Sequence, residues 1–81
     1  MSLAVLRKRS ISLSGHSTSL ALEPEFWVVL EAMAAADGVN LSTLIVGIDR
    51  GRAPRPLASA CRTAALGWAQ GRRDKPAAAT A

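Results

Sequence analysis

The side chains best suited to catalysis or metal binding are few and far apart. His16 is the only histidine and Cys61 the only cysteine in 81 residues. One imidazole and one thiol fall short of a zinc site, and a single cysteine forms no internal disulfide. The string Gly15-His16-Ser17 puts a hydroxyl beside an imidazole, but a nucleophilic serine also needs a group that orients its base, and the sequence suggests none. We therefore predict that the protein is not an enzyme and has no metal or other cofactor.

Charge is the stronger chemical signal. The chain has 10 Lys and Arg against 6 Asp and Glu, for a formal net charge of +4. This balance favours a polyanionic partner, such as nucleic acid or a membrane surface. The densest basic cluster is Arg7-Lys8-Arg9, which in isolation is more often a solvated terminus than a recognition element.

The apolar segments are too short for a membrane. No uninterrupted apolar run exceeds five residues, as in Phe26 to Leu30. A membrane span needs roughly 20 such residues, and no secretory apolar region follows the basic cluster. The sequence therefore predicts a cytoplasmic protein with no membrane partner.

Two stretches alternate between polar and apolar residues. They run from Ser10 to Ser14 and from Ser17 to Leu22, and a period of two predicts half-buried strands. In the second stretch one face carries Thr18, Leu20 and Leu22, and the other carries Ser17, Ser19 and Ala21. Whether Gly15-His16 folds the stretches into a hairpin or bends an extended arm stays open here.

The period changes at Pro24, which suits the first turn of a helix. Apolar residues then follow a helical stripe, and Gly38 is a plausible left-handed stop. Asn40 is well placed to cap a second helix that ends near Gly51. The apolar stripes of the two helices are Phe26, Leu30, Met33 and Ala34, and then Leu41, Leu44, Ile45 and Ile48.

Five segments result from this pattern. Two prolines interrupt 51–56, which is predicted to be a basic linker. Leu57, Ala60, Cys61, Ala64 and Trp68 then repeat at helical spacing. The segments are 1–16, a basic arm or extra strand; 17–50, a strand-helix-helix core; 51–56, the linker; 57–70, a third amphipathic helix; and 71–81, a disordered tail.

A strand followed by two short helices leaves an unpaired edge and an uncovered apolar face. A second copy would solve both problems, since two such strands can pair antiparallel across a two-fold axis above four helices. We therefore predict a mainly α fold with one short β-ribbon strand per chain, an intertwined homodimer, and a C-terminal third helix. The predicted dimer core is Leu20, Leu22, Phe26, Leu30, Met33, Leu44, Ile45 and Ile48. Whether dimers associate further stays open.

The order and residues of these elements resemble a known family. Thr18-Ser-Leu-Ala-Leu-Glu-Pro-Glu-Phe-Trp27 and Gly38-Val-Asn-Leu-Ser-Thr-Leu-Ile45 look like the ribbon-helix-helix family of Arc and methionine-repressor type. The lead-in Arg-Ser-Ile-Ser-Leu-Ser-Gly-His and the third helix resemble a subgroup of short bacterial members. This resemblance implies a repressor that inserts its ribbon into the major groove of double-stranded DNA.

The resemblance also implies roles for individual residues. Ser17, Ser19 and Ala21 would face the bases, and the amides around Leu41, Ser42 and Thr43 would hold a backbone phosphate. The family usually has an Arg, Lys, Asn or Gln among the strand residues that read bases, so direct readout here is weak. Phosphate contacts from Arg7, Lys8 and Arg9 would compensate.

Three functional hypotheses follow. The leading one is a sequence-dependent transcriptional regulator, a repressor that binds DNA as a homodimer. A variant is an antitoxin-type protein, and a different class is an adaptor that keeps the fold but binds another protein. Both alternatives would use residues 51–70 for the protein partner.

Overall fold

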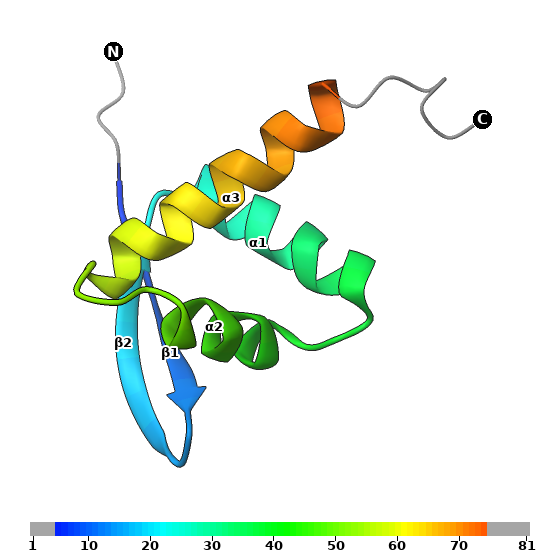
Figure 1. Ribbon diagram of the computed structural model, residues 1–81. Helices are drawn as coiled ribbons and strands as arrows, with labels where there is room; N and C mark the ends of the chain where they lie inside the picture. Colours follow the sequence, from blue (N-terminus) through cyan, green and yellow to red (C-terminus); the bar gives the residue numbers. More distant parts are fainter. Residues whose placement is uncertain (1–4, 75–81) are drawn as a thin grey trace.

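The computed structural model describes residues 5–74, with side chains for residues 5–71, as a β-ribbon followed by three helices (Figure 1). The helices lie together against one side of the ribbon. In chain order the elements are β1 (Arg7–Leu13), β2 (His16–Leu22), α1 (Pro24–Asp37), α2 (Leu41–Arg50) and α3 (Leu57–Asp74).

The two strands form an antiparallel hairpin within one chain. Pairing runs from Arg7 opposite Leu22 to Leu13 opposite His16. Ser14 and Gly15 connect the strands with φ of 48° and 92°, and two successive positive values match the twist of a tight hairpin. The alternation therefore marks a hairpin rather than an extended arm.

The inner face of the ribbon is the face that the helices cover. Its buried side chains are Ile11, Leu13, Leu20 and Leu22, of which Leu22 has no exposed surface. They pack in one cluster with Trp27, Leu30 and Ile45 of the helices. A strict period of two in both strands thus supplies one complete apolar layer of the core.

Helix α1 begins and ends where the sequence predicts. Pro24 occupies its first turn, where the missing amide hydrogen costs no intrahelical bond. At its end Gly38 has φ of 70°, and the amides of Gly38 and Val39 donate to the carbonyls of Ala35 and Ala34. This pair of bonds satisfies the last carbonyls of the helix.

Helix α2 has the predicted side-chain cap. The Asn40 side-chain oxygen accepts a hydrogen bond from the Thr43 amide at 2.8 Å. The main-chain carbonyl of Asn40 accepts the first bond of the helix from the Leu44 amide. Asn40 therefore fixes the direction in which α2 leaves the turn.

Helix α3 completes the core. Ala60, Cys61 and Ala65 are buried against the other elements. Arg62 donates to Glu23 at 2.8 Å and places its guanidinium 5.9 Å from the centre of the Phe26 ring, which joins α3 to the start of α1. The helix continues through Asp74, so residues 71–74 are helical rather than part of the predicted tail. Residues 75–81 of that tail lie outside the described residues.

The predicted fold class, mainly α with a β-ribbon and a third helix, is confirmed. The second strand of the ribbon, however, comes from the same chain. The sequence alone predicts that a second copy pairs with this edge of the strand, but a two-residue turn lets β1 pair there at a small cost in loop entropy.

The residues predicted as a dimer core divide into two groups. Leu20, Leu22, Leu30 and Ile45 are buried within the single chain. The others are partly buried beside the same cluster: Phe26, Met33, Leu44 and Ile48. Trp27, absent from the predicted core, is 5% exposed and belongs to it.

No single helix in residues 5–74 is long and apolar enough to cross a bilayer, and α1 with α2 would qualify only as a pair bent by 98°.

Candidate nucleic-acid interface

The outer face of the ribbon is a surface of small polar side chains. The register places Ser10 opposite Ser19 and Ser12 opposite Ser17, with Lys8 opposite Ala21 at the open end. All of these residues are exposed except Ala21, which is half-buried. The three predicted base-facing residues, Ser17, Ser19 and Ala21, therefore share one face with Lys8, Ser10 and Ser12 of β1.

This face can donate and accept hydrogen bonds without a steric barrier. Serine hydroxyls serve as either donor or acceptor, and their short side chains let a partner approach the ribbon closely. Lys8 adds one positive charge, and the six residues include no acidic side chain. The surface fits a partner that is anionic and rich in hydrogen-bonding groups.

The basic cluster is split between the two faces. Arg7 and Arg9 lie opposite Leu22 and Leu20, on the side of the helices, whereas Lys8 lies on the outer face. Because neighbouring residues in a strand point in opposite directions, three consecutive basic residues cannot act as one patch. Of the predicted phosphate contacts in this cluster, only Lys8 shares a face with the serines.

Arg9 is held against α1. Its guanidinium forms an ion pair with Glu31 at 3.1 Å and lies 4.8 Å from the centre of the Trp27 ring. The Trp27 indole also donates a hydrogen bond to the main-chain carbonyl of Arg7 at 2.9 Å. These contacts fasten the open end of the ribbon to α1, so Arg9 has a structural role.

The amino end of α2 lies beside the ribbon. The Asn40 cap uses the Thr43 amide, which leaves the amides of Leu41 and Ser42 as donors ahead of the first intrahelical bond. Ser42 and Thr43 line a hollow together with Ser12 of β1. The predicted phosphate-binding end of α2 and the outer edge of β1 are therefore neighbours.

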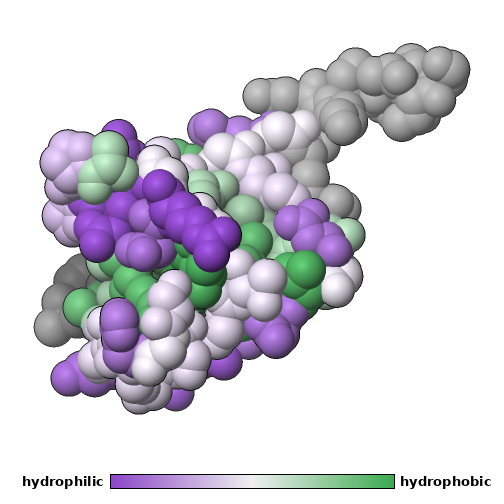
Figure 2. All heavy atoms as spheres, turned by 60° about the horizontal axis from the view of Figure 1, so that its bottom comes forward, coloured by the Kyte–Doolittle hydropathy of each residue, from purple (hydrophilic) through white to green (hydrophobic). Residues whose placement is uncertain are grey.

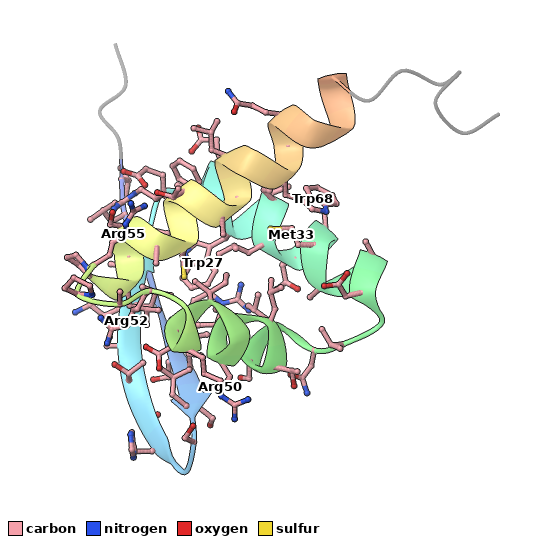
Figure 3. The ribbon with its side chains drawn as sticks, viewed as in Figure 1. Trp27, Met33, Arg50, Arg52, Arg55 and Trp68 are labelled. Atoms are coloured by element: carbon pink, nitrogen blue, oxygen red, sulfur yellow. The ribbon has the colours of Figure 1, made fainter. Side chains whose placement is uncertain are left out.

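Arg50 is a basic residue of this region that is not among the predicted site residues. It is exposed and lines the same hollow, on the same face of α2 as Thr43, Val46 and Gly47. Figure 3 shows Arg50 near the end of β1. The i, i+3, i+4, i+7 spacing from Thr43 to Arg50 could have indicated that it shares their face of α2.

The linker arginines belong to a different part of the molecule. Arg52 forms an ion pair with Asp49 at 2.6 Å and donates to the carbonyl of Arg55 at 2.8 Å. Arg55 donates to the Thr63 hydroxyl at 2.9 Å. Figure 3 places both arginines where the linker joins α2 to α3, so the predicted linker is a hydrogen-bonded segment.

Titratable and metal-binding groups contribute little to this surface. Within residues 5–71 no group of three or more His, Cys, Asp or Glu side chains could hold a metal ion. Burial raises the pKa of Cys61 to about 11, so its thiol stays protonated at neutral pH and packs as a small apolar group. His16 is exposed at the start of β2.

The comparisons with known proteins agree with this architecture. A family model described as the ribbon-helix-helix domain matches residues 6–69. The solved structure of an uncharacterized protein from Bordetella pertussis Tohama I matches with a TM-score of 0.76 and 34% sequence identity. That match covers 96% of this chain and 68% of the Bordetella chain. No protein of curated function gives a significant match.

Proposed function

We propose that this chain, which belongs to the ribbon-helix-helix family, is a sequence-dependent transcriptional repressor that places the outer face of its ribbon in the major groove of DNA. Domains of this family are DNA-binding regulatory domains and not enzymes. The observation that carries the proposal is the outer face itself: a hairpin whose exposed side is free of acidic residues and lined by hydroxyls.

The dimensions and chemistry of the ribbon support this placement. A two-stranded ribbon fits the major groove of B-form DNA, where each base pair presents donors and acceptors at its edge. Ser17 and Ser19 can bond to several bases, so they discriminate less than an Arg or Asn would. We infer that sequence preference is modest and that phosphate contacts supply much of the affinity.

The proposed phosphate contacts combine main-chain and side-chain donors. The amides of Leu41 and Ser42 carry the positive end of the α2 dipole, and the hydroxyls of Ser42 and Thr43 lie beside them. Lys8, on the same face of β1 as Ser12, and Arg50, which lines the hollow with Ser12, add positive charge. Arg7 and Arg9, which are also predicted phosphate contacts, lie on the other face and are left out of this proposed set.

Members of this family generally form dimers, and we propose that two chains of this protein pair through the free edge of β2. Seven residues form that strand, with neither a lysine, an arginine nor a proline to oppose edge pairing. The edge of β1 begins with three basic residues that would repel a second copy. The half-buried members of the predicted dimer core would then contact the second chain, which remains a prediction: Phe26, Met33, Leu44 and Ile48. A DNA-bound repressor of this kind would act in the cytoplasm.

The experiment that tests the proposal is fluorescence anisotropy with duplex DNA from upstream of the protein's own gene and with unrelated duplex. The Ser19→Glu variant places a negative charge at the centre of the outer face, and Gln70→Glu makes the same charge change on exposed α3. We expect preference for the upstream DNA, a large loss of affinity for Ser19→Glu and little change for Gln70→Glu. Equal losses in both variants would contradict the proposal.

A further inference from the structure

A second concave surface lies among the helices. It is an open groove of about 510 Å³ between the second half of α2 and the first half of α3. Its small apolar lining, here called the floor, is Gly47, Ala60 and Ala64, and Arg52 and Arg55 of the linker form its rim. Ile48, which is also a predicted dimer contact, lines the groove as well. No ribbon residue lines this groove. It is therefore separate from the outer face of the ribbon, although it shares Gly47 with the hollow that Ser12 and Thr43 line.

The small residues of the floor keep the groove open. Glycine weakens the interior of a helix relative to alanine, yet Gly47 stands in the middle of α2. A Cβ atom added there would meet no atom of the chain within 4 Å. Packing inside the chain therefore does not require glycine at this position, whereas close approach of an external group would, either in this groove or in the hollow beside Ser12 that Gly47 also lines.

The arginines at the rim are held in place before any partner arrives. Arg52 is fixed by Asp49 and by the Arg55 carbonyl, and Arg55 is fixed by the Thr63 hydroxyl. These bonds leave further guanidinium N–H groups on both residues. Ordered guanidinium groups lose less conformational entropy when they bind carboxylates than mobile ones do.

The charge around the groove is positive. Asp49 is the one acidic side chain in the segment from Gly47 to Thr63, and it is paired with Arg52. Figure 2 shows strongly hydrophilic surface next to exposed hydrophobic surface on the face that it turns forward. Carboxylates would complement the rim, and small apolar side chains would complement the floor.

We propose that this groove binds an acidic peptide segment of a partner protein. Carboxylates of the segment pair with Arg52 and Arg55, and an apolar side chain between them covers Gly47 and Ala64. A peptide fits better than a DNA backbone, because an apolar floor between two helices offers nothing to a phosphate chain. The helices that form the groove also cover the inner face of the ribbon, so both partners can be bound by different surfaces.

The test is anisotropy of a fluorescein-labelled peptide of repeated Glu-Glu-Leu-Ala units, titrated with the full chain. The same peptide with Lys in place of Glu is the charge control. We expect saturable binding of the acidic peptide alone, and a loss of about tenfold or more for Arg55→Glu, which reverses a charge at the rim. Ala64→Leu, which fills the floor without changing charge, should lower the affinity similarly while the far-UV circular dichroism stays native.

Lys8→Glu provides the matched control, because it makes the same charge change on the outer face of the ribbon. It should keep peptide binding and lose affinity for duplex DNA, whereas Arg55→Glu should do the opposite. If Lys8→Glu and Arg55→Glu weaken peptide binding equally, or if Ala64→Leu has no effect on it, the groove assignment is wrong. Loss of DNA affinity in Arg55→Glu, with no binding of the acidic peptide, would assign the groove to nucleic acid instead. Failure of DNA binding in the wild-type chain would leave the peptide result intact, so the two proposals fail separately.

Discussion

The two faces of the ribbon differ completely although they alternate residue by residue along the same strands. Leu20 is 3% exposed and packs under the helices, whereas Ser19, its neighbour, is exposed on the other side. Burial of the apolar inner face stabilises the fold. The serines of the outer face are exposed, so they can be replaced by any small polar residue without loss of packing. Substitutions one position apart should therefore change different properties, stability in one case and binding in the other.

The largest expected effect is that of truncating the inner face. Leu20→Ala should lower the free energy of unfolding by about 2 to 5 kcal/mol, because it removes buried methyl groups and leaves a cavity. Ser19→Ala should change it by less than about 0.5 kcal/mol, as an exposed substitution does. Urea unfolding followed by circular dichroism measures both. Equal stabilities of the two variants would show that the ribbon is not packed as described.

A smaller effect is expected where the open end of the ribbon is fastened to α1. Trp27→Phe keeps an aromatic ring but removes the indole donor to the Arg7 carbonyl. We expect the free energy of unfolding to fall by about 1 to 2 kcal/mol, because the variant loses a part-buried hydrogen bond and some packing contacts. Relative to the wild type, hydrogen exchange in this variant should speed up more at Arg7 to Arg9 than at Ser12 and Leu13. An equal change in exchange rate along all of β1 would contradict this anchoring.

The ion pair between α1 and α3 should make stability depend on pH. The hydrogen bond from Arg62 lowers the pKa of Glu23 below its ordinary value of 4.5. A lowered pKa in the folded state stabilises the fold above the unfolded pKa, and this stabilisation is lost as pH falls through the folded pKa. Glu23→Gln should therefore melt below the wild type at neutral pH, and the difference should shrink below about pH 4.

Glu25→Gln is the matched control for that experiment. Glu25 is also an acidic residue at the start of α1, but it is exposed and takes no part in the ion pairs of the described residues. Its melting temperature should follow the wild-type pH profile. A difference between Glu23→Gln and the wild type that is constant with pH would show that the carboxylate of Glu23 is not the source.

Local signals in the sequence predicted the elements well. Gly38 and Asn40 mark the end of α1 and the start of α2, because left-handed stops and side-chain caps depend on one residue and its neighbours. The alternation in Ser17 to Leu22 also separated the buried face from the exposed one. Such features need no knowledge of distant contacts.

Features that depend on distant contacts could not be predicted in this way. Phe26 and Trp27 both fit the stripe of α1, and distant contacts decide that Trp27 is the buried one: its indole bonds to the Arg7 carbonyl of β1, whereas Phe26 lies beside Arg62 of α3. Edge pairing within a chain and between chains satisfies the same hydrogen bonds, so alternation did not identify β1 as the partner of β2. No sequence spacing places Arg50 in the same hollow as Ser12, since that placement depends on how α2 packs against the ribbon.

The measurement that tests the central claim most directly compares Lys8→Ala with Arg9→Ala in duplex DNA binding across a salt series. These residues are adjacent and equally charged, but Lys8 lies on the outer face and Arg9 is paired with Glu31 on the inner one. If the outer face contacts DNA, Lys8→Ala should reduce the slope of log affinity against log salt by about 1 for each chain bound, or about 2 for a dimer, and Arg9→Ala should leave the slope unchanged. A reduced slope for Arg9→Ala with none for Lys8→Ala would contradict the account.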